Sequence, residues 1–141
     1  MKKSKVLKSF FVLLFTIQLF TCCSTSSILS QVVGKEFSVT VIKGNIIEAS
    51  KLENGLPKIT FGENGILTGF TGCNTFNGSY KLESNLLSLE PGSITKMMCY
   101  DLTEMDFLNA LKEVTRWKLE GNNLYLLNNE KSVITLILTG K

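Results

Sequence analysis

The sequence predicts a single small α+β domain, in which a mostly antiparallel sheet, strongly curved or barrel-like, packs against one helix. Three observations predict this class. Short segments rich in β-branched and aromatic residues begin about every 8–12 residues, as in antiparallel sheets. Only one stretch has the spacing of an amphipathic helix. Strand-like segments both precede and follow that helix, which favours α+β over an alternating parallel arrangement.

The expected strands alternate in polarity or are rich in β-branched residues, and glycine, asparagine or proline separates them. They are residues 35–42, 58–61, 66–70, 79–82, 86–89, 116–119, 124–127 and 133–138. Turns are expected at residues 43–45, 62–65, 83–85, 120–123 and 128–131. Asn-Gly at the tip of the second of these turns is typical of a hairpin.

Two further boundaries follow from special residues. The stretch from Gly72 to Gly78 is dense in residues that tolerate positive φ or bond their own backbone, so we expect a tight loop there. Pro91-Gly92 is expected to end the strand that begins at Leu86, because proline lacks the N–H that a sheet uses.

One helix is expected over residues 102–115. Asp101 is a plausible N-cap, and Glu104 three residues later fits the return half of a capping box. Apolar residues recur at a spacing of three or four and predict a buried face. They are Leu102, Met105, Phe107, Leu108, Ala110, Leu111 and Val114. Leu108 and Leu111 are expected to be in the core.

The N-terminus has the order of a bacterial secretory signal. Four lysines precede an apolar stretch at residues 10–20, which is too short for a comfortable membrane span. Leu19 lies three residues before Cys22, and this resembles a lipobox. We therefore expect a signal peptide over 1–21, an acylated Cys22 (Cys23 if the register shifts), a flexible tether over 22–33, and a folded domain over 34–141. The alternative is an ordinary signal peptide cleaved near residues 24–27.

Removing this signal changes the charge. The 141-residue chain carries +3, but fifteen basic residues less the four lysines of the signal leave eleven against twelve acidic residues. The mature chain is therefore near −1, with no basic stripe, and nucleic acid is not an expected partner.

The sequence offers little catalytic or metal-binding chemistry. It contains no histidine, so the commonest general base and metal ligand is missing. We expect no catalytic residue, no metal and no cofactor. Adjacent Met97 and Met98 would face opposite sides of a strand, which argues against a copper site with Cys99.

Cys73 and Cys99 have two interpretations. They form a disulfide in an oxidising compartment, or they are two buried thiols that pack as small apolar groups. The disulfide is favoured outside the cytoplasm, although sequence does not show whether their Cα atoms approach within about 7 Å. They are not in a C-x-x-C motif, so a thioredoxin-like redox pair is not expected.

Asn74, Asn77 and Tyr80 are candidates for a small binding loop. Their amides and hydroxyl could line a polar pocket. Turn chemistry with one packed aromatic ring is the favoured interpretation of the same residues.

Two segments carry a family resemblance. Gly72-Cys-Asn-Thr-Phe-Asn-Gly-Ser-Tyr80, followed by Thr95-Lys-Met-Met-Cys99, resembles the META domain family, also called HslJ-like. The resemblance extends over about residues 34–138, and Phe37 stands where the family usually has tryptophan. It implies a small β-rich domain with a packed helix, often in envelope lipoproteins. It also implies associations with heat shock, novobiocin resistance, motility or secretion, and no catalytic mechanism.

These observations give one leading function and two alternatives. We expect a non-enzymatic envelope lipoprotein, held at the membrane by acyl chains such as palmitate, that acts in envelope maintenance or stress response. The outer membrane is the expected site, with the domain in the periplasm or at the surface, as a monomer with a possible envelope protein partner. The alternatives are an accessory or inhibitor module that docks on another envelope protein, and a cysteine-dependent enzyme.

Overall fold

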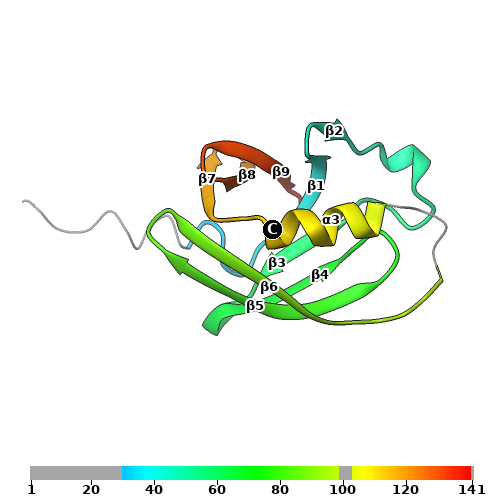
Figure 1. Ribbon diagram of the computed structural model, residues 1–141, viewed down its shortest axis with the longest axis horizontal. Helices are drawn as coiled ribbons and strands as arrows, with labels where there is room; N and C mark the ends of the chain where they lie inside the picture. Colours follow the sequence, from blue (N-terminus) through cyan, green and yellow to red (C-terminus); the bar gives the residue numbers. More distant parts are fainter. Residues whose placement is uncertain (1–29, 99–102, 141) are drawn as a thin grey trace, which may run out of the picture.

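The computed structural model describes residues 30–98 and 103–140. In this part of the chain, nine strands form one sheet, and the α-helix α3 (Thr103–Lys112) packs against it (Figure 1). Among these residues no helix combines the length and apolar character that a membrane crossing needs. The predicted N-cap at Asp101, together with Leu102, lies outside the described residues.

Eight of the nine strands follow the predicted order, and the two-residue strand β2 (Asn45–Ile46) is an addition that begins in the turn predicted at residues 43–45. The nine strands are β1 (Glu36–Ile42), β2 (Asn45–Ile46), β3 (Lys58–Phe61), β4 (Ile66–Phe70), β5 (Thr75–Glu83), β6 (Leu86–Ile94), β7 (Arg116–Glu120), β8 (Asn123–Asn128) and β9 (Lys131–Leu138). Two short 3-10 helices, η1 (Ala49–Lys51) and η2 (Glu63–Gly65), lie between β2 and β4.

The sheet curls until its first and last long strands meet. The spatial order is β2-β1-β3-β4-β5-β6-β7-β8-β9, and β1 also pairs with β9. Every pairing between these strands is antiparallel, which confirms the prediction of a mostly antiparallel sheet with one helix. Closure is weakest between β6 and β7, which share one residue pair, Leu86 with Arg116.

Tight turns set the register of the hairpins. Ile42 pairs with Asn45, so only Lys43 and Gly44 form the turn between β1 and β2. Both have positive φ, +48° and +86°, as a two-residue hairpin of the favoured twist requires.

The core lies inside the curled sheet, beneath α3. Phe37 is fully buried and meets Phe61 edge to face at 6.3 Å between ring centres, and Phe61 meets Tyr80 in the same way at 5.2 Å. Phe76 packs against Phe107 of α3 at 6.2 Å. Edge-to-face contacts suit the charge distribution of aromatic rings. Aromatic side chains from both halves of the chain therefore fix the helix over the sheet.

The helix is shorter than predicted, and its buried face is rotated. Phe107, Ala110 and Leu111 are fully buried, Leu108 is half-buried, and Met105 is 64% exposed. The expectation that Met105 belongs to the core face was therefore wrong. The predicted apolar stripe, with residues three apart, included Met105. The face that is actually buried contains Phe107, Ala110 and Leu111, which are three and four residues apart.

Strands β5 and β6 are both longer than predicted. The loop expected over residues 72–78 ends at Asn74, and Pro91-Gly92 does not end β6. Gly78 lies opposite Pro91, and a Cβ at Gly78 would overlap the carbonyl oxygen of Glu90, so only glycine permits this approach.

Pro91 is tolerated because of the side of β6 on which it falls. The N–H of Leu87 donates to the Thr115 carbonyl on the side away from β5, at 3.0 Å. Backbone groups alternate along a strand, so Pro91 faces that same side. There β7 has already diverged and takes no hydrogen bond.

We predict that Leu111→Ala lowers the free energy of unfolding by about 2–5 kcal/mol, because the truncation leaves a cavity under the helix. Urea denaturation measures the change. Met105→Ala on the same helix is the matched control and should stay within about 0.5 kcal/mol, since its side chain is exposed. Equal losses in the two variants would contradict this assignment of the buried face.

Candidate functional site

Residues of the signature and of α3 form a polar node around the buried side chain of Asn74, and we define this node as Thr71, Asn74, Thr95, Met97 and Glu104. Asn74 is at its centre and is 1% exposed. Its Nδ2 donates to Glu104 Oε2 at 2.9 Å and to the Met97 carbonyl at 3.2 Å. Its Oδ1 accepts from the Met97 N–H at 2.7 Å and from the Thr95 hydroxyl at 2.9 Å. The amide therefore joins three segments: the β4–β5 loop, the end of β6 and the start of α3.

Thr71 shapes the loop that presents Asn74. Its hydroxyl donates to Glu104 Oε2 at 2.5 Å and accepts from the Asn74 N–H at 2.8 Å. The backbone of Thr71 also donates to the Asn74 carbonyl at 2.8 Å. Gly72 in between has φ +98°, a conformation that side chains rarely adopt, and this explains the glycine before Cys73.

The hydrogen bonds of the node hold the β4–β5 loop, the end of β6 and the start of α3 together. An amide buried without partners costs free energy, and here both its donor and acceptor atoms are bonded. Glu104, predicted as part of a capping box, has a carboxylate oxygen bonded to both Thr71 and Asn74, while the predicted cap Asp101 lies outside the described residues. The favoured interpretation of Asn74 as turn chemistry thus describes its loop, whereas the contact of Asn74 with the helix was not predicted.

The candidate binding loop of Asn74, Asn77 and Tyr80 does not converge on one pocket. Asn77 and Tyr80 belong to β5, where Asn77 is exposed and Tyr80 is 9% exposed. The Tyr80 hydroxyl donates to the Gly62 carbonyl at 2.7 Å. Burial raises the pKa of the Tyr80 phenol, so it stays protonated and keeps donating. Tyr80 is the packed aromatic that the sequence favoured.

The signature cysteine in this loop is nearly buried. Cys73 is 8% exposed, and the Asn74 Nδ2 approaches its sulfur at 3.7 Å. Cys22, Cys23 and Cys99 lie outside the described residues, so both the lipidation site and the Cys73–Cys99 pairing stay predictions. In the ranges 30–98 and 103–140 no three cysteine, aspartate or glutamate side chains group as metal ligands would.

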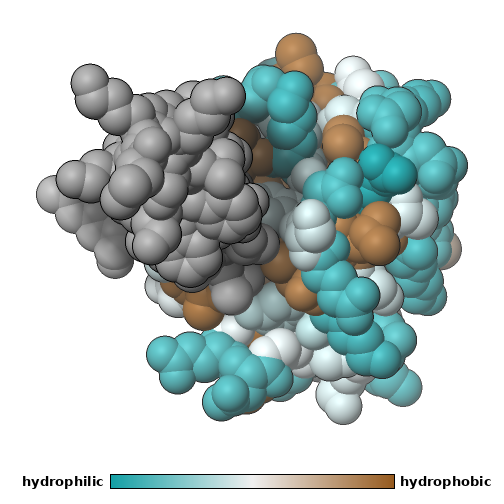
Figure 2. Space-filling view, turned by 90° about the vertical axis from the view of Figure 1, so that its left-hand side faces the viewer, coloured by the Kyte–Doolittle hydropathy of each residue, from teal (hydrophilic) through white to brown (hydrophobic). Residues whose placement is uncertain are grey.

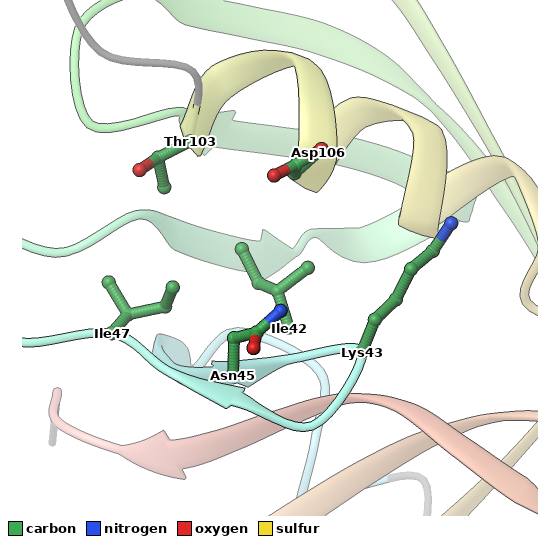
Figure 3. Close-up of a pocket in the computed structure, with 6 residues that line it drawn as sticks. All are labelled: Ile42, Lys43, Asn45, Ile47, Thr103 and Asp106. Atoms are coloured by element: carbon green, nitrogen blue, oxygen red, sulfur yellow. The ribbon is translucent and has the colours of Figure 1, made fainter.

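A small cleft lies between the β1–β2 hairpin and α3. It has a volume of about 130 Å³ and is lined by Ile42, Lys43, Asn45, Ile47, Thr103 and Asp106. Figure 3 shows Thr103 and Asp106 on the helix facing Asn45 and Ile47 on the hairpin, while Lys43 extends toward the far end of the helix. We call this the hairpin–helix cleft.

Of the two charged residues that line this cleft, Lys43 is paired with another side chain, whereas Asp106 is paired with no other described residue. Lys43 Nζ forms an ion pair with Glu113 Oε1 at 2.6 Å. No ion pair or side-chain hydrogen bond joins Asp106 or Asn45 to another described residue. The cleft therefore combines an apolar floor, a neutralised lysine and an unpaired carboxylate.

Sequence reasoning missed the cleft. Lys43 and Asn45 fall in a predicted turn, and Asp106 is not among the apolar residues of the predicted helix face. Only the packing of α3 against β1 brings the two segments together, and that packing is not a property of either segment alone. Lys43 has φ +48°, which non-glycine residues seldom adopt, but that conformation is visible only in the structure.

Within residues 30–98 and 103–140, seven large apolar side chains are exposed. They are Ile46, Ile66, Leu86, Met97, Met98, Met105 and Ile137. On the face shown in Figure 2, apolar atoms appear in several separate places among polar ones. Scattered apolar residues of this kind are ordinary on protein surfaces.

We predict that Asn74→Ala lowers the free energy of unfolding by about 1–3 kcal/mol, because it leaves the Met97 N–H and the Glu104 carboxylate short of a partner. Asn77→Ala is the matched control on the exposed side of β5, with an expected change within about 0.5 kcal/mol. Chemical denaturation of both variants measures the difference. A neutral Asn74→Ala would show that the node does not hold the segments together.

Comparisons with known proteins agree with this architecture. A structure determined by NMR is 27% identical, with a TM-score of 0.61, over 77% of this chain and 92% of that one. A second NMR structure, from Burkholderia xenovorans, is 19% identical, with a TM-score of 0.62, over 82% of this chain and 88% of that one. A crystal structure of a DUF4847 family protein from Bacteroides vulgatus is 17% identical, with a TM-score of 0.55, over 81% and 99%. The last two show a shared fold.

A search of curated proteins finds no match. The model of the META domain matches residues 30–140, which is most of the chain and includes every described residue. The segments that suggested the family from sequence form the polar node and the strand β5 that leads from it. The chain therefore belongs to the META domain family.

Proposed function

We propose that the protein is a non-enzymatic envelope lipoprotein, anchored by acyl chains on Cys22, whose META domain serves envelope maintenance or the response to envelope stress. The observation that carries the proposal is the order of basic residues, apolar stretch and cysteine at the N-terminus. The arrangement of the signature supports the non-enzymatic part, because the side chains of Thr71, Asn74 and Glu104 bond to one another and hold the loop to the helix.

Chain length limits how far the domain can lie from such an anchor. The described domain begins at Ser30, and Val33 already bridges to Phe61. Seven residues lie between Cys22 and Ser30, and the eight Cα-to-Cα steps that join them span at most roughly 28 Å when fully extended. Acyl chains contribute about 0.8 kcal/mol per buried methylene, so several on one cysteine would hold the domain close to a bilayer.

We predict that Cys22→Ser releases the protein from the membrane fraction, because it removes the acylated residue. Cell fractionation with detection of the META domain measures this, and Cys23→Ser is the matched control that should stay membrane-bound. Release by Cys23→Ser alone would shift the register by one residue. Retention of both variants would contradict the lipoprotein proposal. A released domain that migrates in a stable complex would favour the accessory-module alternative.

We also propose that Cys73 is bonded to Cys99 and that the bond is structural. Two observations support the pairing. Cys73 is nearly buried, with 8% of its surface exposed, in the loop that carries Asn74. Asn74 already bonds Met97, two residues before Cys99, which keeps this part of the chain close to the loop. Closing a loop of 26 residues restricts the unfolded chain by roughly 3.5 kcal/mol in the loop-entropy model.

We predict that the double variant Cys73→Ser/Cys99→Ser melts about 8–25 °C lower, from a loss of roughly 2–4 kcal/mol in a domain of this size. Native oxidised protein should leave both cysteines unlabelled by a thiol reagent, and reduction should expose them. Scanning calorimetry and mass spectrometry measure the two effects. Complete labelling of the native protein with unchanged melting would revive the cysteine-dependent enzyme.

A further inference from the structure

We propose that the hairpin–helix cleft binds a primary alkylammonium group, with its charge on Asp106 and its alkyl chain on Ile42 and Ile47. This inference concerns a site that the proposed anchoring does not use, and it stands whether or not Cys22 carries lipid. It rests on the lining of the cleft, on its size and on the pairing of its charges.

The cleft has an apolar floor and polar walls. Ile42 is 3% exposed and Ile47 is half-buried, so the floor is apolar. Asp106 and Asn45 are exposed on opposite walls, one on the helix and one on the hairpin (Figure 3). An ammonium group has three donors and no acceptor. The Asp106 carboxylate and the oxygen of a rotated Asn45 amide are acceptors of the kind that it needs.

The charges favour a cation. Lys43 would repel an ammonium, but Glu113 holds its Nζ at 2.6 Å and neutralises it. The first turn of α3 carries Glu104 and Asp106, and its N-terminal dipole supplies only about half a positive charge. One negative charge at Asp106 therefore stays uncompensated beside the cleft. A carboxylate ligand would meet that charge directly.

The size limits the ligand to a short chain. The cleft measures about 130 Å³, whereas sites for drug-sized ligands occupy about 300–1,000 Å³. A four-carbon alkyl chain with a terminal ammonium fits the volume of the cleft, with its chain on the apolar floor and its charge between the polar walls. This chemistry occurs in free amines and in lysine side chains of a polypeptide, and a binding experiment separates the two sources.

The test uses the full-length ¹⁵N-labelled chain in detergent micelles, titrated with n-butylammonium and followed by amide chemical shifts. We expect saturable shifts confined to residues 42–47 and 103–106, at concentrations of about 1–10 mM for so small a ligand. n-Butanol and butyrate, which share the alkyl chain but lack the positive charge, should bind at least about tenfold more weakly. Equal binding of all three probes, or preferred binding of butyrate, would overturn the proposal.

Two variants locate the charge. Asp106→Asn should weaken n-butylammonium binding about tenfold or more, while Glu90→Gln, which removes an exposed carboxylate from β6, should leave it unchanged. Asn45→Ala should weaken binding a few-fold, and it tests the opposite wall if the helix variant fails to fold. Unchanged affinity in a folded Asp106→Asn would sink the assignment.

Two further probes identify the source. Nα-acetyl-lysine N-methylamide carries the ammonium on a peptide unit, and cadaverine carries it on a free diamine. Tighter binding of the lysine derivative indicates a polypeptide lysine, and tighter binding of cadaverine indicates a free amine. Binding of neither, when n-butylammonium binds, would show that the cleft admits no biological ammonium and would overturn the proposal.

Discussion

The side-chain amide of Asn74 joins segments that are far apart in the sequence. Its oxygen and nitrogen bond residues 95–97 after β6 and Glu104 at the start of α3, and Thr71 reinforces the same carboxylate. Because the amide is buried, any rearrangement that separates these segments would leave polar atoms without partners in an apolar setting. The position of the helix over the sheet depends on this contact, and the hairpin–helix cleft depends in turn on the position of the helix.

The sheet leaves one gap that the helix must cover. β1 and β9 pair over five residue pairs, whereas β6 and β7 share one. α3 lies in sequence between these two poorly paired strands and packs Phe107 and Leu111 into the core. Apolar burial by the helix thus replaces the hydrogen bonds that neighbouring strands supply elsewhere around the sheet.

Local patterns in the sequence predicted most of the strands but not their full lengths. Strands such as β3, β4 and β8 were predicted within a residue or two, because turn residues bound them and their side chains alternate. β5 and β6 extend through glycines and a proline that usually break strands. Pro91 can lie within β6 because β7, which comes later in the sequence, pairs only with the start of β6 and needs no N–H from residue 91.

The candidate sites divide in the same way. The loop around Gly72 was predicted, because positive φ is a property of single residues. Its bond to Glu104 was not, since a contact across 30 residues has no local signature. Met105 was placed on the wrong face of the helix because a periodic pattern fixes the spacing of an apolar stripe but not its centre.

The pairing of β1 with β9 also places the two ends of the described domain next to each other. Thr139 donates to the Glu36 carbonyl at 3.0 Å, so the last described residues lie beside the beginning of β1. The hairpin–helix cleft lies at the other end of that strand, roughly 20 Å farther along at about 3.3 Å per residue. Ser30 and Thr139 therefore lie toward one end of the domain and the cleft toward the other, so a ligand in the cleft would be remote from a lipid at Cys22.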